Sequence, residues 1–330
     1  MHITHSTWIK SLGQLRKKML AEKIPDNILQ KAIQQNIWFT HFYIEKSLTA
    51  ILTWWEEKCL SAFLQQYPES TDAPKRVGII AAGNVPCVGL HDILMVLWSG
   101  NIAFVKLSHQ DEILIPFLIE KWTKYLPELQ KRIFFVPKID KVDFLIATGS
   151  NNTARYIEYY FDDIPKIIRK NRFSVAILRG NETFIELQAL CYDMFLYNGM
   201  GCRNVSHIFA LTEDIKPLQE AINQYDRQYI SAIYLQKIAY DRAVYSLLPD
   251  DNSIDCGIIF LKKVAAPQYA PIGLLHLCFF ATEEEMQAAL SLYSPQIQCV
   301  VGIETRLGQA QHPALSDFAD GVDVWKSIKK

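Results

Sequence analysis

A cysteine that follows two glycines is the residue in this chain best suited to covalent chemistry. Cys202 stands directly after Gly201 and close behind Gly199, and glycines allow a tight turn while leaving room for an approaching carbonyl carbon. A helix is expected over 183–196 and a strand over 205–211, which would place the thiol on a loop between two rigid elements. Cys202 is therefore a candidate nucleophile. The alternative interpretation is a small buried hydrophobic side chain.

Three further candidate groups lie where predicted strands end. Asn84 follows the strand expected at 77–82, and a side-chain amide in a cleft can donate to a developing oxyanion. Lys106 ends the next strand, where its ammonium group could bind a ribose or a phosphate. The run Thr148-Gly149-Ser150 leads from a strand into a helix, and helix N-termini bind phosphates through N–H groups. Each group has a structural alternative, either as a turn residue or as a side chain that points to solvent where a strand ends. The informative feature is therefore the order of the groups along the chain.

The elements expected to position these groups are N-terminal helices followed by two series of alternating strands and helices. Apolar residues recur at helical spacing over 42–63, and Thr40 is the expected N-cap. The first series has strands at 77–82, 102–106, 133–136 and 144–147 and helices at 89–98, 111–125 and 151–161; the second has strands at 175–178, 205–211, 257–261, 274–280 and 298–302. Such alternation predicts an α/β protein with parallel sheets covered by helices.

Composition argues against several functional classes. The chain is 50% hydrophobic and 21% charged, and its formal net charge of −1 gives no electrostatic basis for binding nucleic acid or an anionic membrane. The seven cysteines lack metal-site spacing, so no metal is expected, and scattered thiols are typical of the cytoplasm. The longest apolar stretch, 270–281, is too short to span a bilayer, and no signal-peptide pattern is present. We therefore expect a cytoplasmic protein without a membrane span.

In this order the motifs resemble those of the aldehyde dehydrogenase superfamily. The resemblance implies that Asn84 is the oxyanion residue of an Asn-x-Pro motif and that Lys106 binds the cofactor ribose. It also implies that Thr148-Gly149-Ser150 is the turn under the cofactor pyrophosphate and that Cys202 is the nucleophile of a Gly-x-x-Cys motif. The dinucleotide fingerprint GxGxxG is absent. The implied fold is α/β and aldehyde dehydrogenase-like, with a Rossmann-type cofactor domain, an α/β catalytic domain and a helical N-terminus.

Within the superfamily the chain is most similar to the acyl-CoA reductases, the branch that contains the fatty-acid reductase of bacterial luminescence operons. The narrower resemblance is carried by Gly89-Leu90-His91-Asp92, by Ser99-Gly100-Asn101 and by the tail segments 307–311 and 318–323. The match covers roughly residues 75–325. The helical N-terminus is less diagnostic.

Two departures from the hydrolytic aldehyde dehydrogenases favour reduction of a thioester. Those enzymes have a water-activating glutamate upstream of the cysteine, whereas the corresponding stretch here, 169–178, contains no carboxylate. The family's glutamate before Phe-Gly-Pro is also missing, since the matching segment, 267–271, reads Pro-Gln-Tyr-Ala-Pro. An acyl-enzyme that is discharged by hydride has no use for an activated water, which would divert it to the free acid.

The resemblance therefore implies NAD(P)H-dependent reduction of an acyl-CoA to an aldehyde, a reaction of fatty-acid metabolism, through a thioester on Cys202. The N–H of Cys202 would join Asn84 in stabilising the oxyanion. The open alternatives are oxidation of aldehydes and a non-catalytic binding protein on the same scaffold. We expect residues 1–172 to hold the helical N-terminus and the cofactor domain, 173–303 the catalytic domain and 304–330 a C-terminal tail.

The residues just after Lys106 suggest which cofactor is used. In NAD-preferring relatives a glutamate three positions beyond the ribose lysine accepts from the adenosine 2′-hydroxyl, whereas His109 stands here beside Ser108. Neither side chain would repel a 2′-phosphate, so NADPH is expected to be accepted at least as well as NADH.

The remaining expectations concern partners and proton transfer. An acyl-CoA is the expected small-molecule substrate, and a homodimer and an acyl-donor protein are the two partner alternatives. His91 and His207 are candidates for a general base by residue type alone. For each of them a structural hydrogen bond is the alternative.

Overall fold

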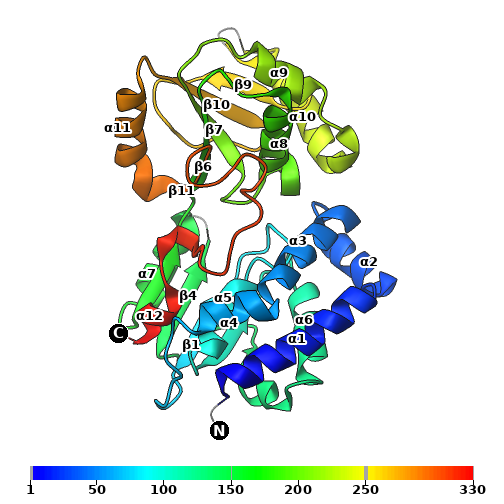
Figure 1. The fold of residues 1–330 in the computed structure, drawn as a ribbon, viewed down its shortest axis with the longest axis vertical. Helices are drawn as coiled ribbons and strands as arrows, with labels where there is room; N and C mark the ends of the chain where they lie inside the picture. The colour runs from blue at the N-terminus through cyan, green and yellow to red at the C-terminus, as the bar shows by residue number, and fades with distance from the viewer. Residues whose placement is uncertain (1–2, 150, 249–251, 330) are drawn as a thin grey trace. The chain divides into compact units, whose positions relative to one another are not determined.

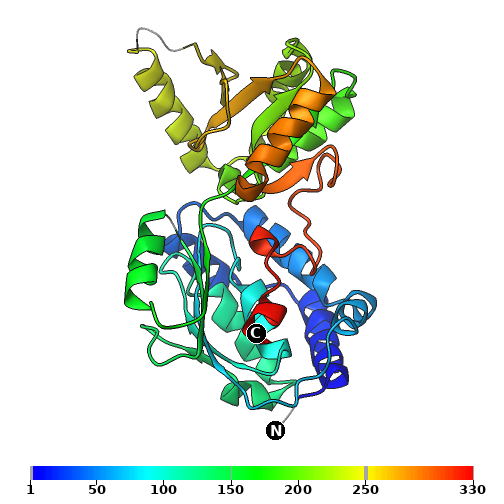
Figure 2. The same cartoon turned by 90° about the vertical axis from the view of Figure 1, so that its left-hand side faces the viewer.

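Two compact units make up the chain in the computed structural model, which describes residues 3–149, 151–248 and 252–329. Unit 1 comprises Met1–Asn171 together with Ala314–Lys330, and unit 2 comprises Arg172–Pro313. Figures 1 and 2 show that each unit has helices around a sheet. Unit 1 is drawn in blue to green with the red C-terminal segment, and unit 2 in green to orange-red.

Helices open unit 1 and cover its sheet. They are α1 (His5–Ala21), α2 (Asp26–Gln35), α3 (His41–Trp54), α4 (Glu57–Leu64), α5 (Leu90–Trp98), α6 (Leu114–Thr123), α7 (Asn151–Tyr160) and α12 (Val324–Lys329). The Thr40 hydroxyl accepts from the N–H of Tyr43 at 3.1 Å, which confirms the predicted N-cap. The helical spacing over 42–63 belongs to two helices, because Glu56 is extended, with ψ 132°, between α3 and α4.

The sheet of unit 1 is parallel, with the strand order β3-β2-β1-β4-β5. Its strands are β1 (Arg76–Ile80), β2 (Ile102–Lys106), β3 (Ile133–Phe135), β4 (Phe144–Thr148) and β5 (Lys166–Arg169). The first four confirm the predicted strands. The sequence pattern missed β5, because this short strand begins with a lysine and ends with an arginine and so has only two apolar residues.

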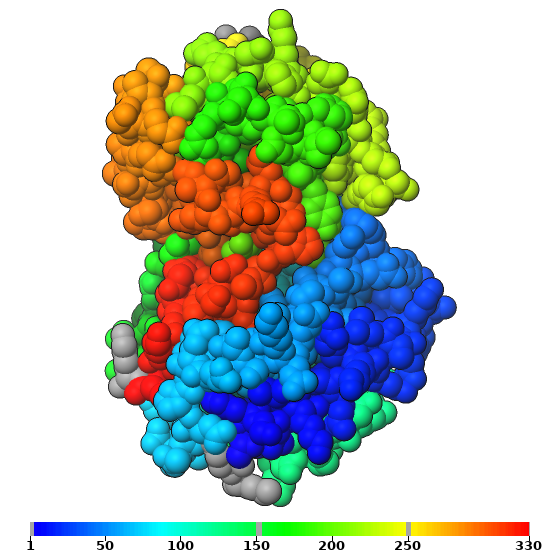
Figure 3. Space-filling view, viewed as in Figure 1, coloured from blue at the N-terminus to red at the C-terminus, as the bar shows by residue number. Residues whose placement is uncertain are grey.

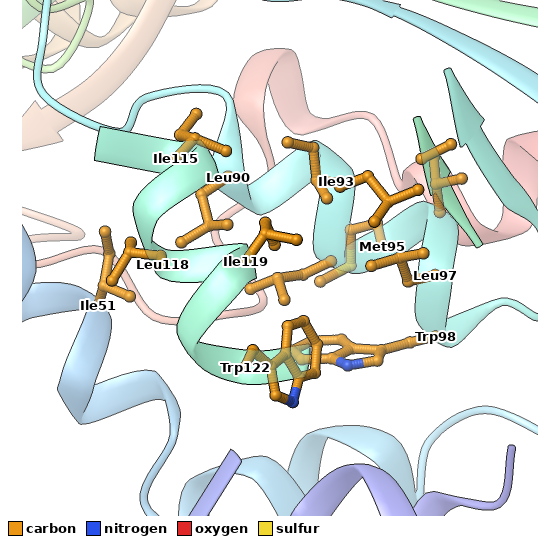
Figure 4. Close-up of a cluster of buried hydrophobic side chains, with 14 of the residues drawn as sticks. Ile51, Leu90, Ile93, Met95, Leu97, Trp98, Ile115, Leu118, Ile119 and Trp122 are labelled. Carbon is orange, nitrogen blue, oxygen red and sulfur yellow. The ribbon is translucent and has the colours of Figure 1, made fainter. Parts of the chain in front are cut away.

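Apolar side chains cover both faces of this sheet. On one face Val77 of β1 packs into a large cluster with α5 and α6, and Figure 4 shows part of this cluster, including Leu90 and Trp122. On the other face Leu145 of β4 packs with Ile157 of α7. Since side chains alternate along a strand, the same strands supply both layers.

The C-terminal segment folds onto unit 1. Trp325 of α12 stacks on Tyr67, with ring centroids 4.4 Å apart. The Tyr67 hydroxyl donates to Asp323 at 2.9 Å, and Lys75 donates to the carbonyl of Ile328 at 2.6 Å. Residues more than 250 positions apart in the chain therefore stabilise one core.

The sheet of unit 2 has the order β11-β6-β7-β10-β9-β8, in which every neighbouring pair is parallel except β8 and β9. Its strands are β6 (Phe173–Leu178), β7 (Val205–Ala210), β8 (Ile254–Asp255), β9 (Phe260–Lys263), β10 (Leu274–Phe279) and β11 (Ile297–Val301). The strand predicted over 257–261 begins later, at Phe260, because Gly257 adopts a left-handed turn conformation with φ 80°.

Helices cover both faces of this second sheet. They are α8 (Phe184–Phe195), α9 (Lys216–Asn223), α10 (Ala232–Tyr245) and α11 (Glu283–Tyr293). Met286 of α11 packs against Val175 of β6, and Figure 1 shows α8, α9 and α10 on the opposite side of the sheet from α11. The predicted second α/β series is therefore confirmed.

The remaining helical segments are short 3₁₀ helices. They are η1 (Pro127–Lys131), η2 (Leu196–Gly199), η3 (Arg227–Tyr229), η4 (Ser294–Gln296) and η5 (Ala319–Gly321). Among the described helices, none combines the length and the hydropathy that crossing a membrane requires.

Candidate functional site

The predicted residues of unit 1 gather at one edge of its sheet. Lys106 and Thr148 are the last residues of β2 and β4, which flank β1 on either side. Ile80 of β1 lies opposite Lys106 on one side and Ala147 on the other, so the three strands end at the same level. Asn84 follows β1 at this edge and is partly buried. The carboxyl ends of parallel strands are where open α/β sheets bind their ligands.

The loops after β1 and β2 lie in close contact. A Cβ built on Gly83 would lie 2.7 Å from both the Cβ and the Oγ of Ser108, so position 83 has no room for a side chain. The Ser108 hydroxyl accepts from the N–H of Gln110 at 3.3 Å, and His109 between them is exposed. The loop that carries Asn84 is thus held against the loop that carries Ser108 and His109.

Two side chains of the N-terminal helical region hold the Asn84 loop in place. The amide Nδ2 of Asn36 donates to the carbonyl of Gly83 at 3.2 Å, and the hydroxyl of Ser47 donates to the carbonyl of Pro86 at 2.5 Å. Both side chains are buried, so water cannot replace these bonds. The N-terminal helices therefore contribute to the position of Asn84, a role that their sequence did not indicate.

A buried carboxylate fixes the end of the same loop. Oδ2 of Asp111 accepts from the N–H of Cys87 at 2.7 Å, and Cys87 has a left-handed φ of 60°. The other oxygen, Oδ1, has no hydrogen-bond partner among the described residues. Burial raises the pKa of Asp111 to about 7, although hydrogen bonds from the N–H groups of Cys87 and Leu114 oppose the shift.

The turn after β4 is supported by a buried ion pair. The N–H of Gly149 donates to the carbonyl of Arg169 at 3.3 Å. The Arg169 guanidinium donates through both Nη atoms to Asp92 of α5, at 2.5 and 2.8 Å. Asp92 belongs to the segment 89–92 that carries part of the family resemblance, and here it serves the structure. Ser150, the third predicted residue of this turn, lies outside the described residues.

Exposure separates two of the seven cysteines from the others. Cys59 and Cys202 are exposed, and the other five are buried. Burial raises the pKa of every buried thiol: to about 12 for Cys191, to about 11 for Cys256 and Cys278, and also above its ordinary value for Cys87 and Cys299. Since the thiolate is the nucleophile, these five are poor candidates for reaction. Cys202 lies on the predicted loop between α8 and β7 and is not a buried hydrophobic residue.

The backbone just before Cys202 is strained. Tyr197, Asn198 and Gly199 of η2 all adopt the left-handed conformation, with φ of 55°, 58° and 69°. For a residue other than glycine the left-handed conformation is less favourable by roughly 1–2 kcal/mol than the right-handed one, so neighbouring contacts must maintain the run. One such contact is the Ser231 hydroxyl, which donates to the Oδ1 of Asn198 at 2.6 Å.

Asn204 joins both ends of this turn. Its Nδ2 donates to the carbonyls of Asp193 and Leu196 at 2.9 and 2.8 Å, with the carbonyl of Met194 at 3.4 Å. Its Oδ1 accepts from the N–H of Gly201 at 2.8 Å. The end of α8 and the residue before the candidate nucleophile are therefore tied to one side chain.

Asp193 of α8 anchors the segment that follows β11. Its carboxylate accepts from the N–H groups of Gly308 and Ala310 at 2.6 and 2.9 Å. Arg203 donates through Nε to the carbonyl of Ala310 at 2.5 Å. Figure 3 shows part of the stretch after β11 in orange-red at the surface. Burial raises the pKa of Asp193 to about 7, although the two N–H donors and the charge of Arg203 oppose the shift.

The two histidines considered as general bases make structural hydrogen bonds. Nε2 of His91 lies 2.9 Å from the carbonyl of Leu315. Nε2 of His207 lies 2.9 Å from the carbonyl of Gln268, and its ring packs edge-on against His276. Burial lowers the pKa of His207 to about 4, so this ring is neutral at physiological pH.

The residues that support the candidate site had no recognisable signal in the sequence. Asn36, Ser47, Asp111, Asp193 and Asn204 act through hydrogen bonds, most of them to main-chain atoms far along the chain. The one local hint was the proximity of Asn204 to Cys202.

Comparisons with known proteins bear on the fold. No model of a protein family matches the sequence, and no curated protein matches it either. Among solved structures, 1-pyrroline-5-carboxylate dehydrogenase from Thermus thermophilus matches with a TM-score of 0.62 at 13% identity, over 98% of this chain and 79% of that one. Betaine aldehyde dehydrogenase from Staphylococcus aureus has a TM-score of 0.62 at 14% identity, over 90% and 75% of the two chains. An oxidoreductase from Marinobacter aquaeolei has a TM-score of 0.60 at 14% identity, over 86% and 70%. The predicted aldehyde dehydrogenase-like α/β fold is therefore confirmed.

Proposed function

We propose that this chain reduces an acyl-CoA to the aldehyde with a reduced nicotinamide cofactor, through an acyl group carried on Cys202. The observation that carries the proposal is the exposed thiol of Cys202 on a strained turn, in a chain with the fold of aldehyde dehydrogenases. In the structure of the Staphylococcus aureus enzyme a cysteine is modified by β-mercaptoethanol, which supports a reactive thiol in proteins of this fold.

The direction of the reaction is argued from missing carboxylates. The stretch 169–178, which includes β6, contains no aspartate or glutamate, and neither does 267–271. An acyl group on Cys202 would then meet no side chain from these segments that activates water. A thioester protected from hydrolysis persists until hydride reaches it, which favours reduction.

The chemistry begins with attack by the Cys202 thiolate on the thioester carbon. The new C–S bond forms, the bond to coenzyme A breaks, and coenzyme A leaves as its thiolate. Asn84 and the N–H of Cys202 are proposed to donate to the oxyanion of the tetrahedral intermediate. When bound, a reduced nicotinamide supplies the hydride that converts the acyl group to an aldehyde and releases the Cys202 thiolate.

The donor set at the sheet edge of unit 1 fits an anionic dinucleotide. Residues 106–110 contain a lysine, a serine and a histidine but no carboxylate. We assign Lys106 to the ribose, Ser108 and His109 to the adenosine 2′-phosphate of NADPH, and the run Thr148-Gly149-Ser150 to the pyrophosphate. One structure of the Thermus dehydrogenase contains bound NAD, so NADH is the alternative cofactor.

The proposal is tested with purified protein, a reduced cofactor and a panel of acyl-CoA chain lengths. Oxidation of NADPH should release one coenzyme A and one aldehyde for each cofactor consumed. The names of the structural neighbours favour aldehyde oxidation as the second candidate, so the reverse assay with aldehydes and NAD(P)⁺ is run in parallel. Oxidation to the free acid without any acyl-CoA reduction would overturn the proposal. Absence of turnover and of Cys202 acylation would favour a binding protein.

The partner alternatives are tested separately. Sedimentation of the purified chain measures whether a homodimer forms. If reduction of acyl-CoA is slow but an acylated carrier protein is reduced quickly, the acyl donor is a protein.

A further inference from the structure

The two residues that follow Cys202 belong to a closed ring of hydrogen bonds. Nδ2 of Asn204 donates to the carbonyl of Asp193, whose carboxylate accepts from the N–H of Ala310. The carbonyl of Ala310 accepts from Nε of Arg203, and Arg203 is bonded covalently to Asn204 and to Cys202. The ring therefore closes on the residue that follows the candidate nucleophile.

Asn204 donates to main-chain carbonyls at the end of α8. A helix ends with carbonyls that have no partner inside the helix, and the carbonyls of Asp193, Met194 and Leu196 at this end accept from Nδ2 of Asn204. Asn204 is only 3% exposed. Because water has little access here, loss of the amide would leave several main-chain groups without replacement partners.

A second contact holds the main chain of Cys202 itself. The hydroxyl of Ser174, a buried residue of β6, donates to the carbonyl of Cys202 at 2.8 Å. Together with the bond from the main-chain N–H of Asn204 to the carbonyl of Gly201 at 3.0 Å, it fixes the peptide units on both sides of the Cys202 α-carbon. The Cys202 sulfur can then move only by rotation of its own side chain, because the backbone beneath it is fixed.

We infer that Asn204 is the positioning residue for Cys202. The left-handed run Tyr197–Gly199 costs conformational energy, and such a run persists only where surrounding contacts over-determine it. Asn204 ties the end of α8 to Gly201 across this run, and so fixes where the sulfur stands. The inference rests on the proposed role of Cys202 as the nucleophile. A displacement of about 1 Å at a reacting atom can reduce turnover about a hundredfold.

The chain offers a matched control in Asn101. Its side chain is 6% exposed, donates through Nδ2 to the Ser99 hydroxyl at 2.9 Å and accepts through Oδ1 from the N–H of Lys75 at 2.9 Å. Asn101 belongs to unit 1, whereas Asn204 belongs to unit 2. Truncating it removes a buried asparagine of the same type without removing any bond to the Cys202 turn.

The experiment compares Asn204→Ala with Asn101→Ala in the full chain. Hydrogen–deuterium exchange measures protection of the peptide that contains Gly201, and steady-state kinetics measure kcat and KM for an acyl-CoA. In Asn204→Ala we expect that peptide to exchange at least about tenfold faster and kcat to fall by about ten- to a hundredfold, with KM within about threefold. In Asn101→Ala we expect a lower Tm, with exchange at Gly201 and kcat within about twofold of wild type.

A third readout uses the two exposed thiols of the same molecule. Iodoacetamide labels Cys59 and Cys202, and mass spectrometry of peptides gives the ratio of their rates. This ratio should change at least about threefold in Asn204→Ala and stay constant in Asn101→Ala. Asn204→Ser, a smaller neutral change that retains part of the bonding, replaces the alanine variant if the latter does not fold.

The outcomes separate the inference from the function on which it rests. If wild-type protein reduces no acyl-CoA, the proposed function fails, while exchange and labelling still test the positioning. If a folded Asn204 variant keeps wild-type exchange at Gly201, the labelling ratio and, where measurable, kcat, the inference is wrong. An equal loss of kcat in Asn101→Ala would also overturn it, because general destabilisation would then explain the effect.

Discussion

Asp92 and Arg169 form a bidentate ion pair inside unit 1, with Nη1–Oδ2 and Nη2–Oδ1 distances of 2.5 and 2.8 Å. Both side chains are buried, and the pair joins α5 to the last residue of β5. The carbonyl of Arg169 accepts from the N–H of Gly149, so the pair also supports the turn assigned to the cofactor pyrophosphate. Because an unpaired buried charge is costly, the two residues depend on each other.

Asp92→Asn should lower the free energy of unfolding by about 3–5 kcal/mol, since it leaves the Arg169 guanidinium buried without a counter-charge. Urea denaturation of wild type and variant measures the difference. The double variant Asp92→Leu with Arg169→Met removes both charges and should recover most of the loss. A double variant no more stable than Asp92→Asn would show that lost packing, and not the unpaired charge, causes the effect.

The sequence predicted the elements that have a strong local pattern. The strands β1, β2 and β4 are apolar runs bounded by turns, and the helices between them have apolar periodicity, so both could be located from the order of apolar and polar residues alone. The short strand β5 has charged residues at both ends and was missed, because its pairing with β4 places it in the sheet. The predicted start of β9 at Gly257 was wrong for a related reason, since only the observed backbone shows the turn conformation of this glycine.

The candidate site could be predicted only as a set of residue types. Lys106 ends a strand, and Asn84 and Cys202 lie on loops next to strands, and a periodic pattern can locate these strand boundaries. The groups that support them act across long separations, such as 47 residues between Asn36 and Gly83. Hydrogen bonds between residues so far apart produce no periodic pattern in the sequence. The supporting residues could therefore be identified only from the structure.

Cys202→Ala should abolish formation of the acyl-enzyme while leaving folding nearly unchanged, because the side chain is exposed and the turn is held by other residues. Intact-mass spectrometry after incubation with an acyl-CoA, without a reduced cofactor, detects the adduct. Cys59→Ala, which removes the other exposed thiol, is the matched control and should acylate as wild type does. Acylation of Cys202→Ala at the wild-type level would contradict the nucleophile assignment.

Asn84→Ala should reduce kcat by roughly a hundredfold or more, the usual effect of removing one oxyanion donor. The KM for the acyl-CoA should change little, because the lost bond is made mainly in the transition state. Steady-state kinetics and the melting temperature are measured together with those of Asn101→Ala. A variant whose kcat stays within a few-fold of wild type while only KM rises would rule out the oxyanion role.

Asp111→Asn should gain stability relative to wild type as the pH rises from about 4 to 7. The pKa of Asp111 is about 7 in the folded chain against an ordinary value of 3.8, so the folded state holds more protons between these values. Stability from this group is present below pH 4 and is lost as the pH rises to 7, by on the order of 4 kcal/mol. The buried carboxyl of Asp193 contributes with the same sign, whereas His207, whose pKa burial lowers to about 4, contributes with the opposite sign, so the effect of Asp111 is read from the difference between variant and wild type.

Urea denaturation at several pH values from about 4 to 8 measures the slope of stability against pH for wild type and Asp111→Asn. Asp111→Asn with Asp193→Asn should gain more stability relative to wild type over this pH range than the single variant does. An unchanged slope in the single variant would mean that Asp111 does not titrate between the ordinary and the raised pKa.

His109→Glu should shift cofactor preference from NADPH towards NADH. The histidine is exposed in the loop that follows β2, close in the chain to Lys106 and Ser108. A carboxylate there would repel a 2′-phosphate and could accept from a 2′-hydroxyl. We expect kcat/KM for NADPH to fall about tenfold or more relative to that for NADH, as an unfavourable interaction of about 1.4 kcal/mol would produce. His41→Glu, which replaces another exposed histidine of unit 1 at the start of α3, controls for the added charge and should leave the ratio unchanged. If His109→Glu also leaves the ratio of the two kcat/KM values unchanged, the side chain points to solvent and does not contact the cofactor.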